Sequence, residues 1–318
     1  MPPSKRGPPC SRGADPAVPE LPEVEVVRHG LQPAVTGATI EGVEVLDERS
    51  LKRHDGPSED FIERLAGARL RGAVRRGKFL WLPIEGVGDF PAEALVAHLG
   101  MSGQVLLRNP QAEAAPLTRI RFALTHPVHG PLRVDFVDQR IFGSMAVDVL
   151  RPTRDGAAAG YGLPLTSIPS QVAHIARDPL DPAFNERAFL RRLAAKRTTI
   201  KRALLDQTLV SGIGNIYADE SLWAARVHYD QPTETLSTRK ARELLSEVRL
   251  VLRRALDEGG TSFDAQYVNV NGASGYFSHS LRAYGQQGTP CTRCGRLIVR
   301  EQFMNRGSHF CPRCQRIR

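Results

Sequence analysis

The sequence predicts a multi-domain α+β protein with a β-sandwich, a helical domain and a cysteine-paired tail in that order. Short segments rich in β-branched and aromatic residues, separated by turn residues, occupy the first half of the chain. The apolar spacing then becomes that of amphipathic helices. Two cysteine pairs fall within the last 28 of the 318 residues. Three different local patterns in consecutive blocks are typical of separate folding units.

The chain opens on a segment without apolar periodicity. Residues 1–18 are rich in Pro, Gly, Ser and Arg, a composition that predicts a disordered extension. A leading helix is expected from Pro19 onwards. Glu23 would lie in its first turn, and Val24, Val27 and Leu31 form an apolar stripe.

Residues 38 to 149 carry the β-rich pattern. The clearest strand candidates are Ala38–Leu46, Phe79–Ile84, Ala94–Leu99, Ile120–Thr125 and Leu132–Val137. Strands at this spacing predict a sandwich or a flattened barrel. With the leading helix, they define a first domain over residues 19–150.

A linker and a helical domain are expected next. Residues 151–180 contain many Pro, Gly and Ala residues, which are typical of a linker. Helices are predicted over Asn185–Ala195, Thr198–Gln207, Asn215–Ala225 and Ser237–Glu258, within a domain over residues 181–285. The last of these is the clearest, because its apolar residues follow the i, i+3, i+4 spacing and Gly259 ends it.

The tail contains two Cys-x-x-Cys pairs. Cys291 and Cys294 are separated by 16 residues from Cys311 and Cys314. Four thiolates in this arrangement predict one structural Zn²⁺ in a domain over residues 286–318. Disulfides are the alternative, but they are typical of secreted chains and the sequence shows no apolar signal segment.

The formal net charge of +9 favours a negatively charged partner. A basic balance suits nucleic acid, although a soluble protein that is merely basic would show the same value. No apolar run approaches the ~18 residues that span a membrane, so no membrane partner is expected.

Six blocks of the sequence resemble the formamidopyrimidine-DNA glycosylase family. They are Pro19-Glu20-Leu21-Pro22-Glu23-Val24-Glu25, Arg75-Arg76-Gly77-Lys78-Phe79-Leu80, His98-Leu99-Gly100-Met101-Ser102-Gly103, Asp138-Gln139-Arg140-Ile141-Phe142-Gly143, Gly212-Ile213-Gly214-Asn215-Ile216-Tyr217 and the terminal cysteine cluster. Each block alone is weak, but together they occur in family order over nearly the whole chain. The resemblance implies a β-sandwich with a leading helix, a helix-two-turns-helix domain and a zinc-finger β-hairpin.

The resemblance makes Pro19 the catalytic nucleophile and Glu20 its acidic partner. In the family, the N-terminal proline is a free secondary amine that attacks C1′ of a damaged nucleotide and forms a Schiff base. The adjacent carboxyl group protonates the sugar ring oxygen. Without Pro19 beside it, Glu20 would be interpreted as a carboxylate at a helix start.

This chemistry requires Pro19 to be the mature N-terminus, because a proline within a chain is an inert tertiary amide. We interpret residues 1–18 as the product of a misassigned start. Val18 is the literal translation of a GUG codon, which in bacteria can initiate with methionine. The alternative is a genuine extension on a protein that is inactive or processed later.

Further site residues follow from the resemblance. Lys78 would contact a phosphate and assist β-elimination, and Arg306 in the zinc hairpin would assist δ-elimination. Met101 and Phe142 would fill the space left by a flipped nucleotide, and Arg140 would bind the widowed base. Outside these blocks, Lys78 would be a surface cation and the two apolar residues would be core.

The helical domain is expected to bind the DNA backbone. Gly212-Ile213-Gly214 resembles the turn of the helix-two-turns-helix element, and the helix that follows directs N–H groups at a phosphate. Asn215, Lys196 and Lys201 are expected to add contacts to DNA. The polar stretch over residues 260–275 resembles the loop that closes over an oxidised purine.

The expected function is base-excision repair by a bifunctional DNA glycosylase and abasic-site lyase. Its substrates would be 8-oxoguanine and formamidopyrimidines in double-stranded DNA, with β,δ-elimination after excision. The expected protein is a monomer in the bacterial cytoplasm. The alternatives are an endonuclease VIII-like enzyme for oxidised pyrimidines and a zinc-bearing DNA-binding protein without catalysis.

Overall fold

The computed structural model describes residues 19–86, 92–113, 115–261 and 275–317. The extension over residues 1–18 and most of the expected capping loop (262–274) lie outside these ranges. The helices are α1 (Leu21–Val35), α2 (Ser58–Leu65), α3 (Glu186–Ala195), α4 (Ile200–Leu205), α5 (Asn215–Ala224) and α6 (Thr238–Asp257). The strands are β1 (Thr39–Val45), β2 (Val74–Arg76), β3 (Phe79–Pro83), β4 (Glu93–His98), β5 (Gly103–Arg108), β6 (Thr118–His126), β7 (Gly130–Asp138), β8 (Ser144–Pro152), β9 (Ser167–Pro169), β10 (Val299–Phe303) and β11 (Arg306–Phe310).

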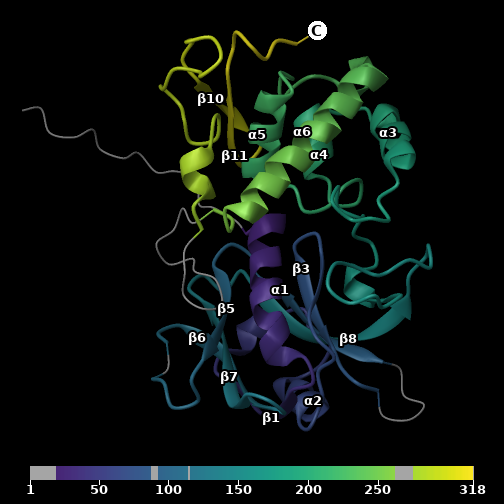
Figure 1. The fold of residues 1–318 in the computed structure, drawn as a ribbon, viewed down its shortest axis with the longest axis vertical. Helices are drawn as coiled ribbons and strands as arrows, with labels where there is room; N and C mark the ends of the chain where they lie inside the picture. The colour runs from purple at the N-terminus through teal and green to yellow at the C-terminus, as the bar shows by residue number, and fades with distance from the viewer. Residues whose placement is uncertain (1–18, 87–91, 114, 262–274, 318) are drawn as a thin grey trace, which may run out of the picture.

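The N-terminal half forms two antiparallel sheets, which confirms the predicted sandwich (Figure 1). One sheet has the order β1-β6-β7-β5 and the other has the order β2-β3-β4-β8-β9. In β6, Ile120, Phe122 and Leu124 point into the core and alternate with more exposed residues. Their side chains pack with those of the second sheet, such as Leu80 and Leu95, in one apolar cluster.

Helix α1 connects this sandwich to the helical half: in Figure 1 most of it lies over the sandwich, and its upper end meets α6. Val24, Val27 and Leu31 pack into the sandwich core. Leu21, at the first turn, belongs instead to the core of the helical domain. Its N–H donates to the carbonyl of Gly212 at 3.0 Å. The beginning of α1 is therefore anchored in the second domain and the rest in the first.

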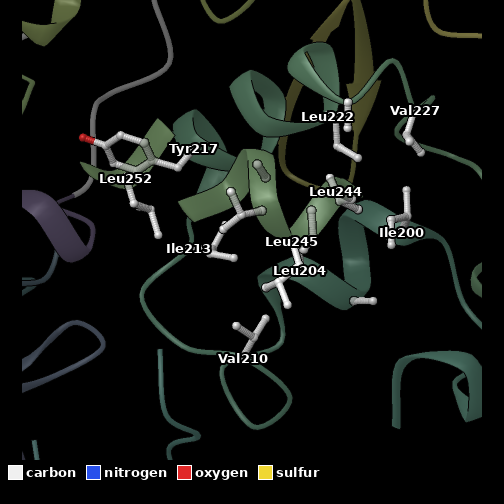
Figure 2. Packing of buried hydrophobic residues seen from close by; sticks show 14 of the residues in the cluster. Ile200, Leu204, Val210, Ile213, Tyr217, Leu222, Val227, Leu244, Leu245 and Leu252 are labelled. Carbon is white, nitrogen blue, oxygen red and sulfur yellow. The ribbon is translucent and has the colours of Figure 1, made fainter. Parts of the chain in front are cut away.

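The helical domain is built around a single apolar core, part of which is drawn in Figure 2. The buried positions of α6, among them Leu244, Leu245 and Leu252, match the predicted stripe. They face α4 and α5 through Leu204 and Leu222. Each of the four helices predicted here begins and ends within two residues of its expected bounds.

The segment interpreted as a linker is folded onto the sandwich. Its strand β9 pairs with β8, joining Leu150 to Pro169 and Arg151 to Ile168. Ile168 and Val172 are buried in an apolar cluster with Trp81 on the outer face of the second sheet. The large buried face of this sheet explains why a Pro- and Gly-rich stretch is held in place.

The tail forms the β10–β11 hairpin, in register from Val299↔Phe310 to Phe303↔Arg306. Phe303 and Phe310 extend the core of the helical domain, so the hairpin is packed against that domain. Among the described residues, no helix is both long and apolar enough to cross a membrane.

Candidate active site

A cleft of about 880 Å³ lies between the sandwich, the helical domain and the hairpin. The sequence-predicted residues that line it are Lys78, Met101, Phe142, Lys196 and Arg306. They come from three domains and from positions more than 200 residues apart, so the fold brings them together. The remaining lining includes His98 from the sandwich and Arg197 and Arg202 from the helical domain.

Glu20 is fully buried at the junction of the two halves. Its carboxylate accepts hydrogen bonds from the N–H of Gly214 at 2.5 Å and of Ile216 at 2.9 Å. Both donors lie at the N-terminus of α5, where unpaired N–H groups favour an anion. Burial raises the pKa of Glu20 to about 7, although the nearby Lys78 cation acts in the opposite direction. A carboxyl group with this pKa is able both to donate and to accept a proton near neutral pH.

Pro19 is buried and directly precedes Glu20 in the chain. The backbone N–H of Glu20 donates to Oε2 of Glu23 at 2.9 Å, which fixes the backbone that carries the proline. The position of Pro19 thus depends on the first turn of α1 and on the helix end that Glu20 contacts.

Glu23 is a site residue for which the sequence predicted only a helix-start role. Its Oε1 accepts from the hydroxyl of Tyr217 at 2.6 Å and from the N–H and hydroxyl of Thr261 at 2.7 and 2.8 Å. Thr261 is the last described residue before position 262. Glu23 therefore joins the Pro19 segment, α5 and the base of the expected capping loop. The repeated Pro-Glu in the first block was the only signal in the sequence.

Lys78 is carried into the cleft by a tight turn between β2 and β3. Gly77 has a φ of +57°, and a Cβ there would lie 2.8 Å from that of Ser211. The turn therefore needs glycine both for its conformation and for its close approach to the helical domain. Burial lowers the pKa of Lys78; Glu20 opposes this effect, and Arg306 adds to it. Charge coupling among Glu20, Lys78 and Arg306 is consistent with their facing one region.

The three residues of the expected wedge lie on two adjoining turns. Met101 follows Gly100 in the first turn, and Arg140 and Phe142 belong to the second. A Cβ at Gly100 would overlap the backbone of Phe142, so the two turns are in direct contact. The Phe142 side chain is 49% exposed, whereas aromatic residues of the core are almost fully covered. An exposed phenylalanine at the edge of a cleft is available for stacking.

His98 is a second site residue for which its block in the sequence indicated no role. Its ring packs on Phe79 with the centroids 4.8 Å apart, and its Nδ1 accepts the N–H of Gly100 at 3.2 Å. Burial lowers its pKa to about 4, helped by the cations of Arg53, Lys78 and Lys52. The imidazole is therefore neutral at physiological pH and supports the Met101 turn.

The three helical-domain residues differ in their availability to DNA. Lys196 lines the cleft and pairs with Asp206, its Nζ lying 2.5 Å from Oδ2. Asn215 opens α5 and donates one N–H of its amide to the carbonyl of Gly307 at 3.1 Å. An amide nitrogen has two N–H groups, so a second donor remains.

The structure corrects the expectation for Lys201. The side chain is fully buried, and its Nζ lies 2.6 Å from both Oδ1 of Asp219 and Oγ of Ser308. It also donates to the carbonyl of Gly307 at 3.2 Å. These partners enclose the ammonium group between the helices and β11, so it anchors the zinc hairpin and is not free to bind a phosphate. A lysine one position inside a helix gives no sequence signal of this.

The four tail cysteines form a site that fits one zinc ion. Their sulfur atoms all lie within 4.8 Å of one another. Cys291 and Cys311 are buried, and Cys294 and Cys314 are half-buried. Arg293, between the first pair, stacks over the Trp223 ring at 3.7 Å and fixes this knuckle to the helical domain. Four converging thiol groups are the donor set of a structural zinc site, and the tail supplies one structural Zn²⁺ site.

Comparison with known families agrees with this architecture. Residues 18–145 match the formamidopyrimidine-DNA glycosylase N-terminal domain, and residues 175–266 match the H2TH domain of the same family. Residues 288–317 match the zinc finger found in FPG and IleRS.

Relatives that match over nearly their whole length are also similar in sequence or structure. The formamidopyrimidine-DNA glycosylase of Leifsonia xyli is 66% identical over 94% of this chain and all of the relative, and that of Thermobifida fusca is 53% identical over 94% and 97%. A solved complex of Lactococcus lactis Fpg with DNA containing an abasic site has a TM-score of 0.76 at 29% identity, covering 93% and 99%. The MutM (Fpg) protein of Thermus thermophilus has a TM-score of 0.75 at 34% identity, covering 93% and 98%. The chain therefore belongs to the formamidopyrimidine-DNA glycosylase family, a family of base-excision-repair DNA glycosylases with abasic-site lyase activity.

Proposed function

We propose that this protein excises oxidised purines from double-stranded DNA and then cleaves the abasic strand by β,δ-elimination. The observation that carries the proposal is the position of Pro19 and Glu20. The pair is buried where the sandwich meets the helical domain, and Glu20 is electrostatically coupled to Lys78, which lines the cleft. A nucleophile beside a carboxyl group of pKa about 7 suits covalent catalysis with proton transfer.

The first step is attack of the Pro19 nitrogen on C1′. The bond between C1′ and the base breaks, and the base leaves with its electron pair and takes up the proton that the Pro19 nitrogen loses after its attack, which returns a lone pair to that nitrogen. Glu20 donates its proton to O4′ as the C1′–O4′ bond opens, and the nitrogen lone pair forms the iminium double bond. This step requires Pro19 to carry a free amine, because an amide nitrogen has no available lone pair.

Strand cleavage follows from the iminium ion. Removal of a proton from C2′ expels the 3′ phosphate, and a second elimination expels the 5′ phosphate. Lys78 and Arg306 would stabilise the leaving phosphates with their positive charge. Lys196 and Asn215 would hold the backbone on either side of the lesion. Lys201 has no place in this set, because it is buried.

The flipped nucleotide leaves a gap in the duplex that must be filled. Met101 and Phe142 would stack in that gap, and the planar guanidinium of Arg140 would donate to the widowed cytosine. The cluster of these residues on two touching turns supports the role, because both would enter the duplex together.

Two assays test the proposal. Excision is measured on matched duplexes that carry 8-oxoguanine or thymine glycol opposite the same base. We expect faster excision of 8-oxoguanine; a preference for thymine glycol would favour the oxidised-pyrimidine alternative. The assay includes an oxidised pyrimidine because Lactococcus lactis Fpg has been solved in complex with DNA that contains one. Arg140→Ala and Phe142→Ala test the wedge, and we expect both to reduce excision on duplex DNA.

We also propose that the protein acts as a monomer in the bacterial cytoplasm, with domains over residues 19–150, 181–285 and 286–318 and with the segment 151–180 packed on the first of them. The core of each half is closed within one chain, which supports the monomer. Sedimentation velocity with and without lesion DNA is expected to give one chain per particle; a concentration-dependent dimer would contradict this.

A further inference from the structure

The turn that carries Arg140 and Phe142 has a strained backbone. Ile141, between them, has a φ of +56°. A β-branched residue rarely adopts this left-handed conformation, because its side chain crowds the backbone. Such a residue is retained only where its surroundings impose the conformation, and these sites are often functional. The contacts that impose it are therefore of interest.

One set of contacts comes from Asp138, at the end of β7. Its carboxylate accepts the N–H of Arg140 at 3.1 Å and the N–H of Gly143 at 2.7 Å. It also accepts a hydrogen bond at 2.5 Å from the hydroxyl of Ser102, a residue of the Met101 turn. Asp138 thus binds N–H groups at both ends of the strained turn and joins it to its neighbour.

The second set comes from Lys52, which is distant in the sequence. Lys52 directly follows a short 3₁₀ helix (Glu48–Leu51). Its Nζ donates to the carbonyl of Ile141 at 2.8 Å and to the carbonyl of Phe142 at 3.0 Å. The N–H groups of the turn are thus bound by an anion and its carbonyl groups by a cation. Charge strengthens both hydrogen bonds, and solvent screens part of this gain because Lys52 is exposed.

The charge of Lys52 is directed at these carbonyls. Within the described ranges, no carboxylate lies within ion-pair distance of its Nζ. The neighbouring carboxylate Asp47 pairs instead with Arg49 and Arg119. The neighbouring cation Arg53 lies over the ring of Phe79. Lys52 is therefore the cation of this segment whose observed partners belong to the strained turn.

We propose that Lys52 is a positioning residue that sets opposite-base selectivity by holding the turn of Arg140 and Phe142 in its strained form. The inference rests on the proposed role of these two residues as the wedge. Arg140 distinguishes bases only if its guanidinium is held at the correct height and angle. Loss of the Lys52 hydrogen bonds lets Ile141 relax, and Arg140 then contacts the opposite base less precisely.

A direct contact between Lys52 and a DNA phosphate is the competing role, and salt dependence separates the two. Each phosphate contact contributes about 0.9 to the slope of log K against log salt concentration. A residue that acts only through the Arg140 turn leaves this slope unchanged. It alters the ratio of rates for different opposite bases, which a phosphate contact does not alter.

The test uses Lys52→Met, which removes the ammonium group and retains most of the side-chain length, and Lys52→Arg, which retains the charge. Lys240→Met is the matched control, because Lys240 pairs with Glu243 on α6. Single-turnover excision of 8-oxoguanine is measured opposite cytosine and opposite adenine. For Lys52→Met we expect the cytosine-to-adenine rate ratio to fall by about tenfold, the scale set by loss of charged hydrogen bonds. Lys52→Arg is expected to retain most of the wild-type rate ratio, and Lys240→Met is expected to leave the ratio unchanged.

A second substrate distinguishes positioning from general damage. Cleavage of a single-stranded abasic oligonucleotide needs no wedge, so we expect Lys52→Met to cleave it at the wild-type rate. An unchanged rate ratio, a salt slope reduced by about 0.9, or equal loss on both substrates would each overturn the proposal. If Arg140→Ala also retains full selectivity, the wedge assignment itself fails. If Lys52→Met retains selectivity and Arg140→Ala loses it, only the positioning role of Lys52 fails.

Discussion

The carboxylate of Glu20 and the backbone N–H of Gly214 form a 2.5 Å hydrogen bond between residues 194 positions apart. A Cβ at Gly214 would overlap the Glu20 carboxyl group, so this approach is possible only with glycine. The contact fixes the candidate catalytic carboxyl group to the helical domain. The geometry of Pro19 thus depends on how the sandwich and the helical domain are joined, which connects the fold directly to the chemistry.

Glu20→Gln is expected to remove the proton donor while retaining its size. We expect base excision to fall by about 10² to 10⁴, the usual contribution of a positioned acid. Binding to DNA with an abasic-site analogue should change little, because Glu20 is buried and is not among the residues that line the cleft. Single-turnover excision and equilibrium binding measure the two effects.

The pH profile of excision gives an independent test of the same group. Glu20, with a pKa of about 7, is protonated below that pH and loses its proton above it. We expect the excision rate to decline as the pH rises beyond about 7, and this limb to be absent in Glu20→Gln. A decline of equal size in the variant would assign the limb to another group.

Gly214→Ala is expected to separate the two domains at the site. The added methyl group would displace Glu20, and overpacking of this kind destabilises by about 1–3 kcal/mol. We expect a lower melting temperature together with slower excision. Gly42→Ala is the matched control, since a Cβ there meets nothing within 4 Å. An active and fully stable Gly214→Ala variant would show that the contact is dispensable.

Zinc removal is expected to disable Arg306 without unfolding the sandwich. The four cysteines bring together the two ends of the segment that contains the hairpin, and Phe303 and Phe310 pack the hairpin on the helical domain. We expect Cys294→Ser to lower the zinc content below one ion per chain and to weaken binding to lesion DNA. Thr292→Ser, between the two cysteines of the first pair, should alter neither. Full zinc content in Cys294→Ser would contradict the four-thiolate site.

Substitution of Lys196 is expected to affect DNA binding, whereas substitution of Lys201 is expected to affect the stability of the fold. Lys196→Met should reduce the salt slope of DNA binding by about 0.9, because it removes one phosphate contact. Lys201→Met should leave the slope unchanged and destabilise the fold by about 3–5 kcal/mol, since the buried Asp219 would lose its cation at Oδ1 and keep the N–H of His309 at Oδ2. Equilibrium unfolding and binding at several salt concentrations check both. A reduced slope in Lys201→Met would return it to the DNA-contact set.

The architecture was largely predictable, because local patterns determine most of it. Helix α6 has an apolar stripe, and buried residues of β6 alternate with more exposed ones. Strands β5 and β8 were not among the predicted strand examples. Each contains a continuous buried run, which gives no alternation. The eight-residue α2 was missed because a pattern of two turns is too short to identify.

The site was predictable only where residues form a recognisable block. Glu23 and His98 lie within such blocks, but their contacts with Thr261 and Phe79 appear only after folding. Lys52 lies outside the blocks and contacts Ile141, 89 positions away. Lys201 was misassigned because a buried lysine and an exposed one have the same local sequence. Its burial follows from Asp219 and Ser308, which lie on α5 and β11.

The identity of the nucleophile is the central claim, and borohydride trapping tests it most directly. Protein whose N-terminus has been established as Pro19 is incubated with 8-oxoguanine duplex and borohydride, and the adduct is mapped by peptide mass spectrometry. We expect one covalent DNA adduct per chain, attached to the nitrogen of Pro19. Absence of an adduct, or an adduct on Lys78, would contradict the account.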